Sequence, residues 1–203
     1  MKKVAILFLS ALLLSAAGYS KDVAIEPSDD YKTIDVRLTK ETNESLQKPK
    51  SGSRDELIRK ITGSSENYAP PVFYVLSSTL FSEGRKDEAM FWFYAGQLRG
   101  RIDANLCAYQ SAGVVVDMLN DKYGPEINQY AFKNIPNLTN TVEKVLAWEE
   151  KTGCNYDRRW VNLFCKEKKS PLSLPKEQWE AIRKKTRDNY RSSFYQALKA
   201  IGH

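Results

Sequence analysis

The hydrophobic pattern is strongest over residues 70–106, where it predicts two helices joined by a short turn. Pro70 and Pro71 suit the first turn of a helix, where a missing N–H costs no hydrogen bond. Gly84 can adopt the left-handed conformation that ends a helix, and the second helix follows it. Apolar residues of the first helix recur at three- and four-residue steps, as on one helix face: Val72, Phe73, Leu76 and Leu80.

The second helix carries four consecutive aromatic residues, Phe91 to Tyr94. Consecutive side chains point in all directions around a helix, so this helix should be buried on most of its sides. Ala89, Ala95 and Gly96 are small enough to let a partner helix approach closely. We therefore expect this hairpin to be the central core element.

The hairpin resembles a tetratricopeptide or Sel1-like repeat, a two-helix unit of about 34 residues. The matching positions are Phe73, Leu76, Ser77, Leu80, Gly84, Ala89, Phe93 and Gly96. The resemblance covers about one unit, residues 70–103, and departs at Arg101, where the family favours proline. It implies a protein-binding role; an ordinary helical hairpin with the same packing is the alternative. The segments 84–89 and 155–160 also resemble small exported bacterial proteins, and that resemblance supplies no activity.

Further helices are predicted on both sides of the hairpin. A capping box, Ser53 to Glu56, starts a helix that ends at Gly63. Gly124 and Pro125 are expected to separate two later helices. The remaining predicted helices cover residues 107–122, 125–135, 139–152 and 175–201. The expected fold is all-α, a single domain of about seven helices over residues 53–203.

The last predicted helix is amphipathic. Its apolar stripe comprises Trp179, Ile182, Thr186, Tyr190, Phe194, Leu198 and Ile201, and its opposite face is basic. Acidic residues interrupt that basic face, and the stripe has the width of a core contact. We expect a helix docked on the body; a helix lying on a membrane surface is the alternative.

Residues 1–20 have the form of a secretory signal peptide, with two lysines before an apolar run and small residues after it. Cleavage is expected after Ala17 or Ser20. No cysteine lies near these sites, which argues against a lipoprotein anchor, and the run is shorter than the ~20 residues that a span needs. The predicted location is the bacterial periplasm, with no stable membrane anchor.

Residues 21–52 are polar and differ from the rest of the chain. Residues 31–38 alternate enough to form a short strand or an extended segment. A single strand is not stable alone. The region is expected to be an extended arm lying on the helical body, or partly disordered.

The formal charge is +6, which falls to about +4 when the signal peptide is removed. A mildly basic protein attracts an acidic protein or envelope component. This charge is too weak to indicate nucleic-acid binding, and an exported protein would not meet nucleic acid.

The chain has three cysteines, and we favour a disulfide between Cys154 and Cys165, which would leave Cys107 as a buried free thiol. A bond from Cys107 to either of the others is the alternative.

No catalytic constellation is visible. The only histidine is His203, so nucleophilic serine or cysteine chemistry has no positioned base. No metal-ligand spacing, phosphate loop or cofactor motif is present. A carboxylate pair among Glu83, Glu88 and Asp103 remains the alternative, as an envelope enzyme or a cell-wall glycan binder.

Two polar-aromatic groups are the candidate binding surface, because tyrosine, tryptophan and arginine anchor interfaces. They are Tyr94, Gln97, Arg99, Arg101, Asp103 and Asn105, and Tyr156, Asp157, Arg158 and Trp160. Arg99 and Arg101 could hold a carboxylate. The alternative is that these arginines pair internally with Asp103 or Asp157. The predicted function is a non-catalytic protein-binding module, one form of which is an immunity protein against a toxin delivered to the periplasm.

Overall fold

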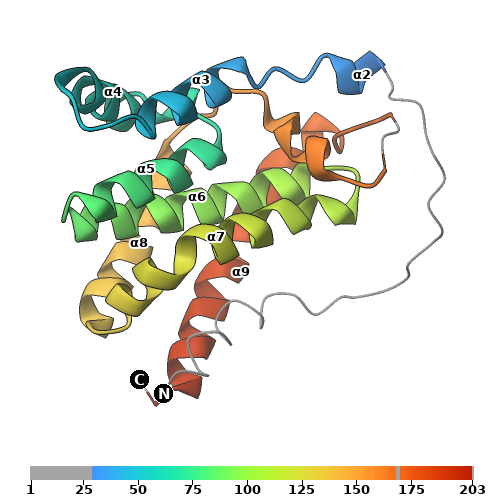
Figure 1. The fold of residues 1–203 in the computed structure, drawn as a ribbon. Coiled ribbons are helices and arrows are strands. Elements are labelled where there is room, and N and C mark those ends of the chain that lie inside the picture. The colour runs from blue at the N-terminus through green and yellow to red at the C-terminus, as the bar shows by residue number, and fades with distance from the viewer. Residues whose placement is uncertain (1–28, 168–169, 203) are drawn as a thin grey trace.

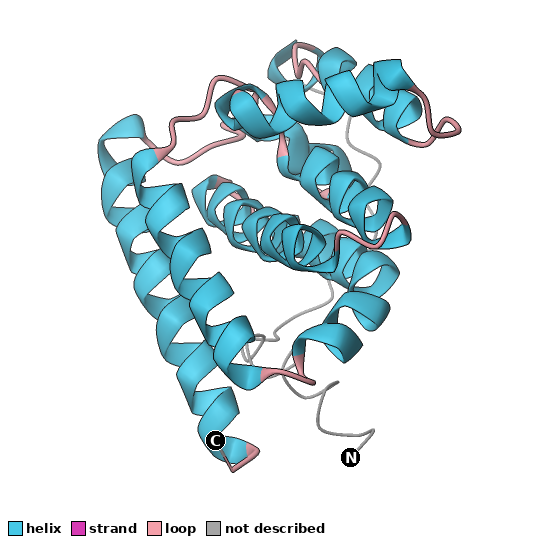
Figure 2. Ribbon diagram, turned by 90° about the vertical axis from the view of Figure 1, so that its left-hand side faces the viewer, coloured by secondary structure: helices cyan, strands magenta, loops and turns pink. Residues whose placement is uncertain are grey.

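The structure is a computed structural model that describes residues 29–167 and 170–202, and in these residues the chain forms eight α-helices and four 3₁₀ turns (Figure 1). The α-helices are α2 Asp29–Lys32, α3 Arg37–Leu46, α4 Gly52–Gly63, α5 Pro70–Ser82, α6 Lys86–Leu106, α7 Val114–Ala131, α8 Ile135–Lys151 and α9 Trp179–Ala200. The 3₁₀ turns are η1 Ser65–Asn67, η2 Gln110–Gly113, η3 Arg158–Phe164 and η4 Lys176–Gln178. Figure 2 shows only helices and loops in the described residues, so the predicted all-α fold is confirmed. The predicted signal peptide lies outside the described residues.

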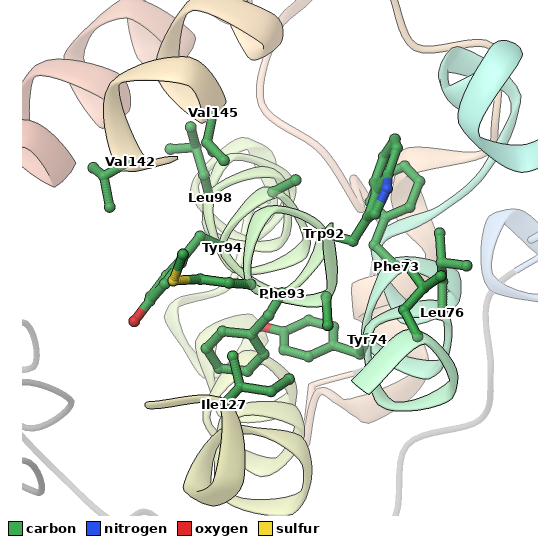
Figure 3. Packing of buried hydrophobic residues seen from close by; sticks show 14 of the residues in the cluster. Phe73, Tyr74, Leu76, Trp92, Phe93, Tyr94, Leu98, Ile127, Val142 and Val145 are labelled. Carbon is green, nitrogen blue, oxygen red and sulfur yellow. The ribbon is translucent and has the colours of Figure 1, made fainter. Parts of the chain in front are cut away.

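Helix α6 is the centre of the molecule and packs against α5, α7, α8 and α9. In Figure 3 Trp92, Phe93 and Tyr94 leave this helix in three different directions. All three side chains are buried, as the aromatic run predicts. A helix covered on all sides can bury polar as well as apolar residues, and this decides where the candidate site residues lie.

The α5–α6 hairpin is tightly packed, as predicted. A Cβ added to Gly96 would lie 3.1 Å from Cδ2 of Tyr74 on α5, so the two helices approach at this glycine. Gly84 has φ +82° in the turn between them, a conformation that glycine adopts without strain. Phe73 and Trp92 lie 5.1 Å apart between ring centroids and both contact Trp148 of α8.

The extended arm predicted for residues 21–52 is wrong for residues 37–46, which form helix α3 on α5. Thr42 and Leu46 are buried one helical turn apart, while Leu38 is exposed. The short alternation at residues 31–38 therefore did not mark one face of a strand. Residues 21–28 lie outside the described part of the chain.

Several predicted helix boundaries are also wrong; the helix predicted over 139–152, for example, already begins at Ile135. Residues 107–109 are not helical, because the chain there runs beside residues 172–174 and forms an antiparallel bridge between Cys107 and Ser173. Helix α7 continues through Gly124 and Pro125. A Cβ at Gly124 would lie 3.0 Å from Cζ of Phe93, so this glycine makes room for the aromatic core instead of ending a helix. Helix α4 begins as predicted within one residue, but its cap is Ser51 and not Ser53.

Helix α9 is docked on the body against α6 and α8, as expected from its apolar stripe. Arg183 and Arg187 on its basic side form ion pairs with the fully buried Glu149 of α8. Within the described residues, no helix combines the length and the apolar character needed to span a membrane.

Candidate functional site

Half of the predicted surface residues are interior. The buried members are Tyr94, Gln97, Arg99, Asp103 and Trp160, each at most 2% exposed. The others are half-buried or exposed: Arg101, Asn105, Tyr156, Asp157 and Arg158. The prediction of a surface position is wrong for the first set, because α6 is enclosed and η3 packs against its end.

The structure nevertheless brings the two predicted groups together around Asp103. Its Oδ2 accepts hydrogen bonds from the Tyr156 hydroxyl and from Nε1 of Trp160, both at 2.8 Å. Its Oδ1 lies 3.4 Å from Nε of Arg158. Burial raises the pKa of Asp103, and Arg158, Trp160 and Tyr156 oppose that shift. This network joins the loop after α8 to α6.

Arg99 lies beside this network, with its guanidinium 4.1 Å from the centroid of a Trp148 ring. Its Nη2 donates to the carbonyl of Thr152 at 3.3 Å. Stacking of this kind suits a desolvated guanidinium. Arg99 is therefore part of the interior and is not accessible to a ligand.

The alternative prediction was that Arg99 and Arg101 pair with Asp103 or Asp157. Both aspartates do pair internally, but with other arginines. Asp103 pairs with Arg158, and Asp157 pairs with Arg159 at 2.8 Å. Asp157 also accepts the backbone N–H of Asp35, which ties the N-terminal segment to the loop. Burial acts to raise the pKa of Asp157, but its hydrogen bonds from Arg159 and Asp35 lower the pKa below the ordinary value.

Arg101 is different from these residues because it faces a cleft. The cleft has a volume of about 280 Å³ and lies between the end of α6, the start of α7 and α9. It is lined by Arg101, Ala104, Asn105, Gly113, Val116, Asp117, Thr186, Asn189 and Tyr190. Nη1 of Arg101 is buried and has no hydrogen-bond partner, and no carboxylate of the described residues lies within ion-pair distance of this side chain. An unpaired buried donor of this kind is rare in native proteins.

The charge near Arg101 comes from Asp117 on α7. Burial raises the pKa of Asp117; Arg101 opposes this shift and Asp121 adds to it. The cleft therefore offers a cation at its floor and an acid on one wall.

The floor of the cleft is fixed by a buried network of amides and phenols. Tyr190 donates to Oε1 of Gln97 at 2.6 Å, and Gln97 donates to Oδ1 of Asn120 at 3.1 Å. The hydroxyl of Tyr74 donates to the same oxygen at 2.8 Å. Four helices are joined in this way, so the cleft is preorganised.

Two exposed apolar side chains lie next to the cleft on α7. Val114 is 51% exposed and Met118 is 56% exposed. Each follows a cleft residue in the chain, Gly113 or Asp117, and they are one helical turn apart on the exposed side of α7. The helix that forms one wall of the cleft thus also carries exposed apolar side chains.

A larger and more open hollow, of about 990 Å³, lies between the α7–α8 turn and α9. Its lining is mainly apolar or amide: Phe132, Lys133, Asn134, Ile135, Pro136, Thr139, Asn140, Tyr195 and Leu198. It offers no buried, unpaired charge, so the Arg101 cleft is the better candidate.

Each of the three acids of the carboxylate-pair alternative is paired with an arginine. Glu83 pairs with Arg54, Glu88 with Arg85, and Asp103 is inside the network described above. Glu88 and Asp103 are fifteen residues apart on α6, roughly 22 Å along a helix, which exceeds the separation of glycosidase carboxylates. Among the described residues, no group of three or more histidine, cysteine or acidic side chains is placed to hold a metal ion.

The predicted Cys154–Cys165 disulfide is not formed in the structure, where all three cysteines are free. Sγ of Cys154 accepts a hydrogen bond from Nη2 of Arg158 at 2.8 Å. Cys107 and Cys165 lie together in one buried cluster.

No protein-family model, curated protein or solved structure matches the chain. The site is therefore defined by its own geometry. Sequence reasoning found Arg101 and Asn105 but missed the cleft residues on α7 and α9, Asp117 and Asn189 among them. A polar residue on the inward side of a helix, as Asn120 is on α7, could have indicated a buried hydrogen-bond network.

Proposed function

We propose that this protein is a non-catalytic protein-binding module of the bacterial periplasm, and that it holds a carboxylate of its partner in the Arg101 cleft. The observation that carries the proposal is the half-buried Arg101 guanidinium with an unpaired Nη1. A guanidinium binds a carboxylate through two parallel hydrogen bonds, which are strongest where water is partly excluded.

The surroundings of the cleft favour a protein partner over a free small molecule. Val114 and Met118 offer exposed apolar area on α7, which forms one wall of the cleft, and methionine and arginine are both enriched in protein interfaces. Tyr190 in the cleft is held by hydrogen bonds that continue to Gln97 and Asn120 beneath it, which reduces the ordering cost of binding.

Charge limits the chemistry of the partner. Its acid must reach Arg101 while avoiding Asp117, so a basic or hydrogen-bond-donating group next to that acid fits the wall of the cleft. The formal charge of the mature chain, about +4, adds a general attraction to acidic proteins. An immunity protein that neutralises an acidic toxin in the periplasm is one concrete form of this proposal, by analogy with other small exported helical proteins.

The test starts with partners recovered on the immobilised mature protein from periplasmic extract, and then measures the affinity of each recovered partner. Arg101→Ala and Met118→Glu are compared with Arg59→Ala, a matched control on the exposed side of α4. We expect Kd to rise about 10- to 30-fold for the two cleft variants, the range of an interface anchor, and to stay unchanged for the control.

The experiment distinguishes a wrong binding site from a wrong function. If a partner binds all variants equally, the cleft is not the binding site. If no protein is retained above the level of an unrelated helical bait, the binding function itself is refuted.

A further inference from the structure

Two of the three cysteines meet in a buried cluster at the end of α6. Cys107 follows the last residue of α6, and Cys165 follows the last residue of η3. They are 7% and 4% exposed, and they share an apolar cluster with Trp160 and Val161. The Cys165 thiol donates to the carbonyl of Val161 at 3.6 Å, so it lies against η3. The Cys107 thiol also donates to Oδ1 of Asn162 at 3.0 Å, which holds it toward η3.

We propose that Cys107 and Cys165 form a disulfide when the protein meets a disulfide oxidant, and that Cys154 remains a free thiol. Both thiols contact adjacent residues of η3, Val161 and Asn162, inside one buried cluster, so side-chain rotation can bring the sulfurs toward the S–S distance of about 2.05 Å. This inference rests on the thiol geometry and does not depend on the proposed binding function.

The chemistry is a thiol–disulfide exchange. The Cys107 thiolate attacks a sulfur of the oxidant, forms a mixed disulfide and releases one thiol of the oxidant. The Cys165 sulfur then loses its proton and attacks Sγ of Cys107, which releases the second thiol. Two protein thiols are oxidised and one disulfide, such as oxidised glutathione or a disulfide-bearing oxidoreductase, is reduced to two thiols.

The interaction between the two thiols supports this order of events. It lowers the pKa of Cys107 and raises the pKa of Cys165, so Cys107 is the sulfur that ionises first.

Cys154 is held away from this pair by the Asp103 network. Its sulfur accepts a hydrogen bond from Arg158, whose Nε lies beside Asp103. A Cys154–Cys165 bond would require that contact to break and the Cys107–Cys165 contact to separate.

The proposed bond would connect two segments that border the functional region. Residues 107–113 lead from α6 through η2 to Gly113 in the cleft wall. Residues 158–165 carry the partners of Asp103. The closed loop contains α7 and α8, so the bond restricts a large part of the unfolded chain.

The test maps the disulfide in the wild-type protein after incubation with oxidised glutathione. Free thiols are alkylated in denaturant at low pH, and the unreduced protein is digested with trypsin. The cysteines fall in separate tryptic peptides, 102–122, 152–158 and 160–166, so each pairing gives a distinct mass. We expect peptide 102–122 linked to 160–166 and one alkyl group on Cys154.

Variants supply a second measurement. Cys154→Ser should still form the bond, and its reduction should lower Tm by about 10 °C. Cys165→Ser should show no such shift on reduction. A link that includes Cys154, or three alkylated cysteines after oxidation, overturns the proposal. The wild-type map decides the question even if a variant does not fold.

Discussion

At the scale of single residues, Asp103 is the polar side chain on which the interior most depends. A carboxylate removed from water is costly unless hydrogen bonds and a counter-charge compensate it. Asp103 has both, and all of its donors come from one loop: Tyr156, Arg158 and Trp160. The same three contacts therefore hold that loop against α6.

We expect Asp103→Ala to lower the free energy of unfolding by about 3–5 kcal/mol, because Arg158 would stay buried without its counter-charge. Asp103→Asn keeps an oxygen for Tyr156 and Trp160 and removes only the charge, so its loss should be smaller. Urea unfolding at pH 7 measures both variants. A loss below 1 kcal/mol for the alanine variant would show that the network adds no net stability.

At the scale of elements, α9 is attached to α8 by one buried and one exposed ion-pair group. Glu149, with a fully buried side chain, accepts from Arg183 at 3.0 Å and from Arg187 at 2.8 Å. Glu143, three to four tenths exposed, pairs with Arg191 at 2.8 Å. Both acids lie on α8 and all three arginine partners on α9, so they form a matched comparison of burial.

We expect Glu149→Gln to cost about 3 kcal/mol, because two largely buried guanidinium groups lose their counter-charge. Glu143→Gln should cost less than about 1 kcal/mol, since solvent screens that pair. Thermal and urea unfolding of the two variants provide the comparison. Equal losses would mean that burial of Glu149 does not determine its contribution.

The elements themselves were predictable where a long apolar period exists. The α5–α6 hairpin and the stripe of α9 each repeat over several turns, and both are confirmed. Predictions from short patterns were wrong, as at residues 37–46, because a few alternating positions fit either a strand or a helix. The prediction that a helix ends at Gly124 was wrong for another reason. The sequence alone does not distinguish a glycine that ends a helix from one that makes room for a side chain such as Phe93.

The candidate site was less predictable than the helices. The sequence indicates that residues 99–105 are polar, but it does not show which of them α7, α9 and η3 cover. Arg99 and Arg101 are two residues apart, yet one stacks in the interior and the other faces the cleft. That difference depends on α7 and α9 around Arg101 and on the end of α8 at Arg99, and no local pattern at residues 99–105 encodes those contacts.

At the scale of the whole molecule, the pH determines the net charge that 31 basic and 25 acidic residues produce. As the pH falls, carboxylates become neutral and the remaining positive charges repel each other. Individual acids do not all act in the same direction. The pKa of Asp157 is lowered in the folded protein and the pKa of Asp117 is raised, both from an ordinary value of 3.8.

These two shifts have opposite consequences for stability. A lowered pKa means that the stabilisation by Asp157 is fully present above pH 3.8 and is lost as the pH falls through its folded-state pKa. A raised pKa means that Asp117 costs nothing below pH 3.8 and destabilises the fold as the pH rises through its folded-state pKa.

We therefore expect Asp157→Asn to lower the free energy of unfolding by about 1–2 kcal/mol at pH 7, through loss of charged hydrogen bonds, and by less at pH 3. Asp117→Asn should instead be more stable than the wild type at pH 7, and the two should converge at pH 3, where both side chains are neutral. Urea unfolding at a series of pH values from 3 to 7 measures both differences, with Glu44→Gln on the exposed side of α3 as the control. If both aspartate variants change stability with the same sign at pH 7, the opposite shifts assigned to these two acids are wrong.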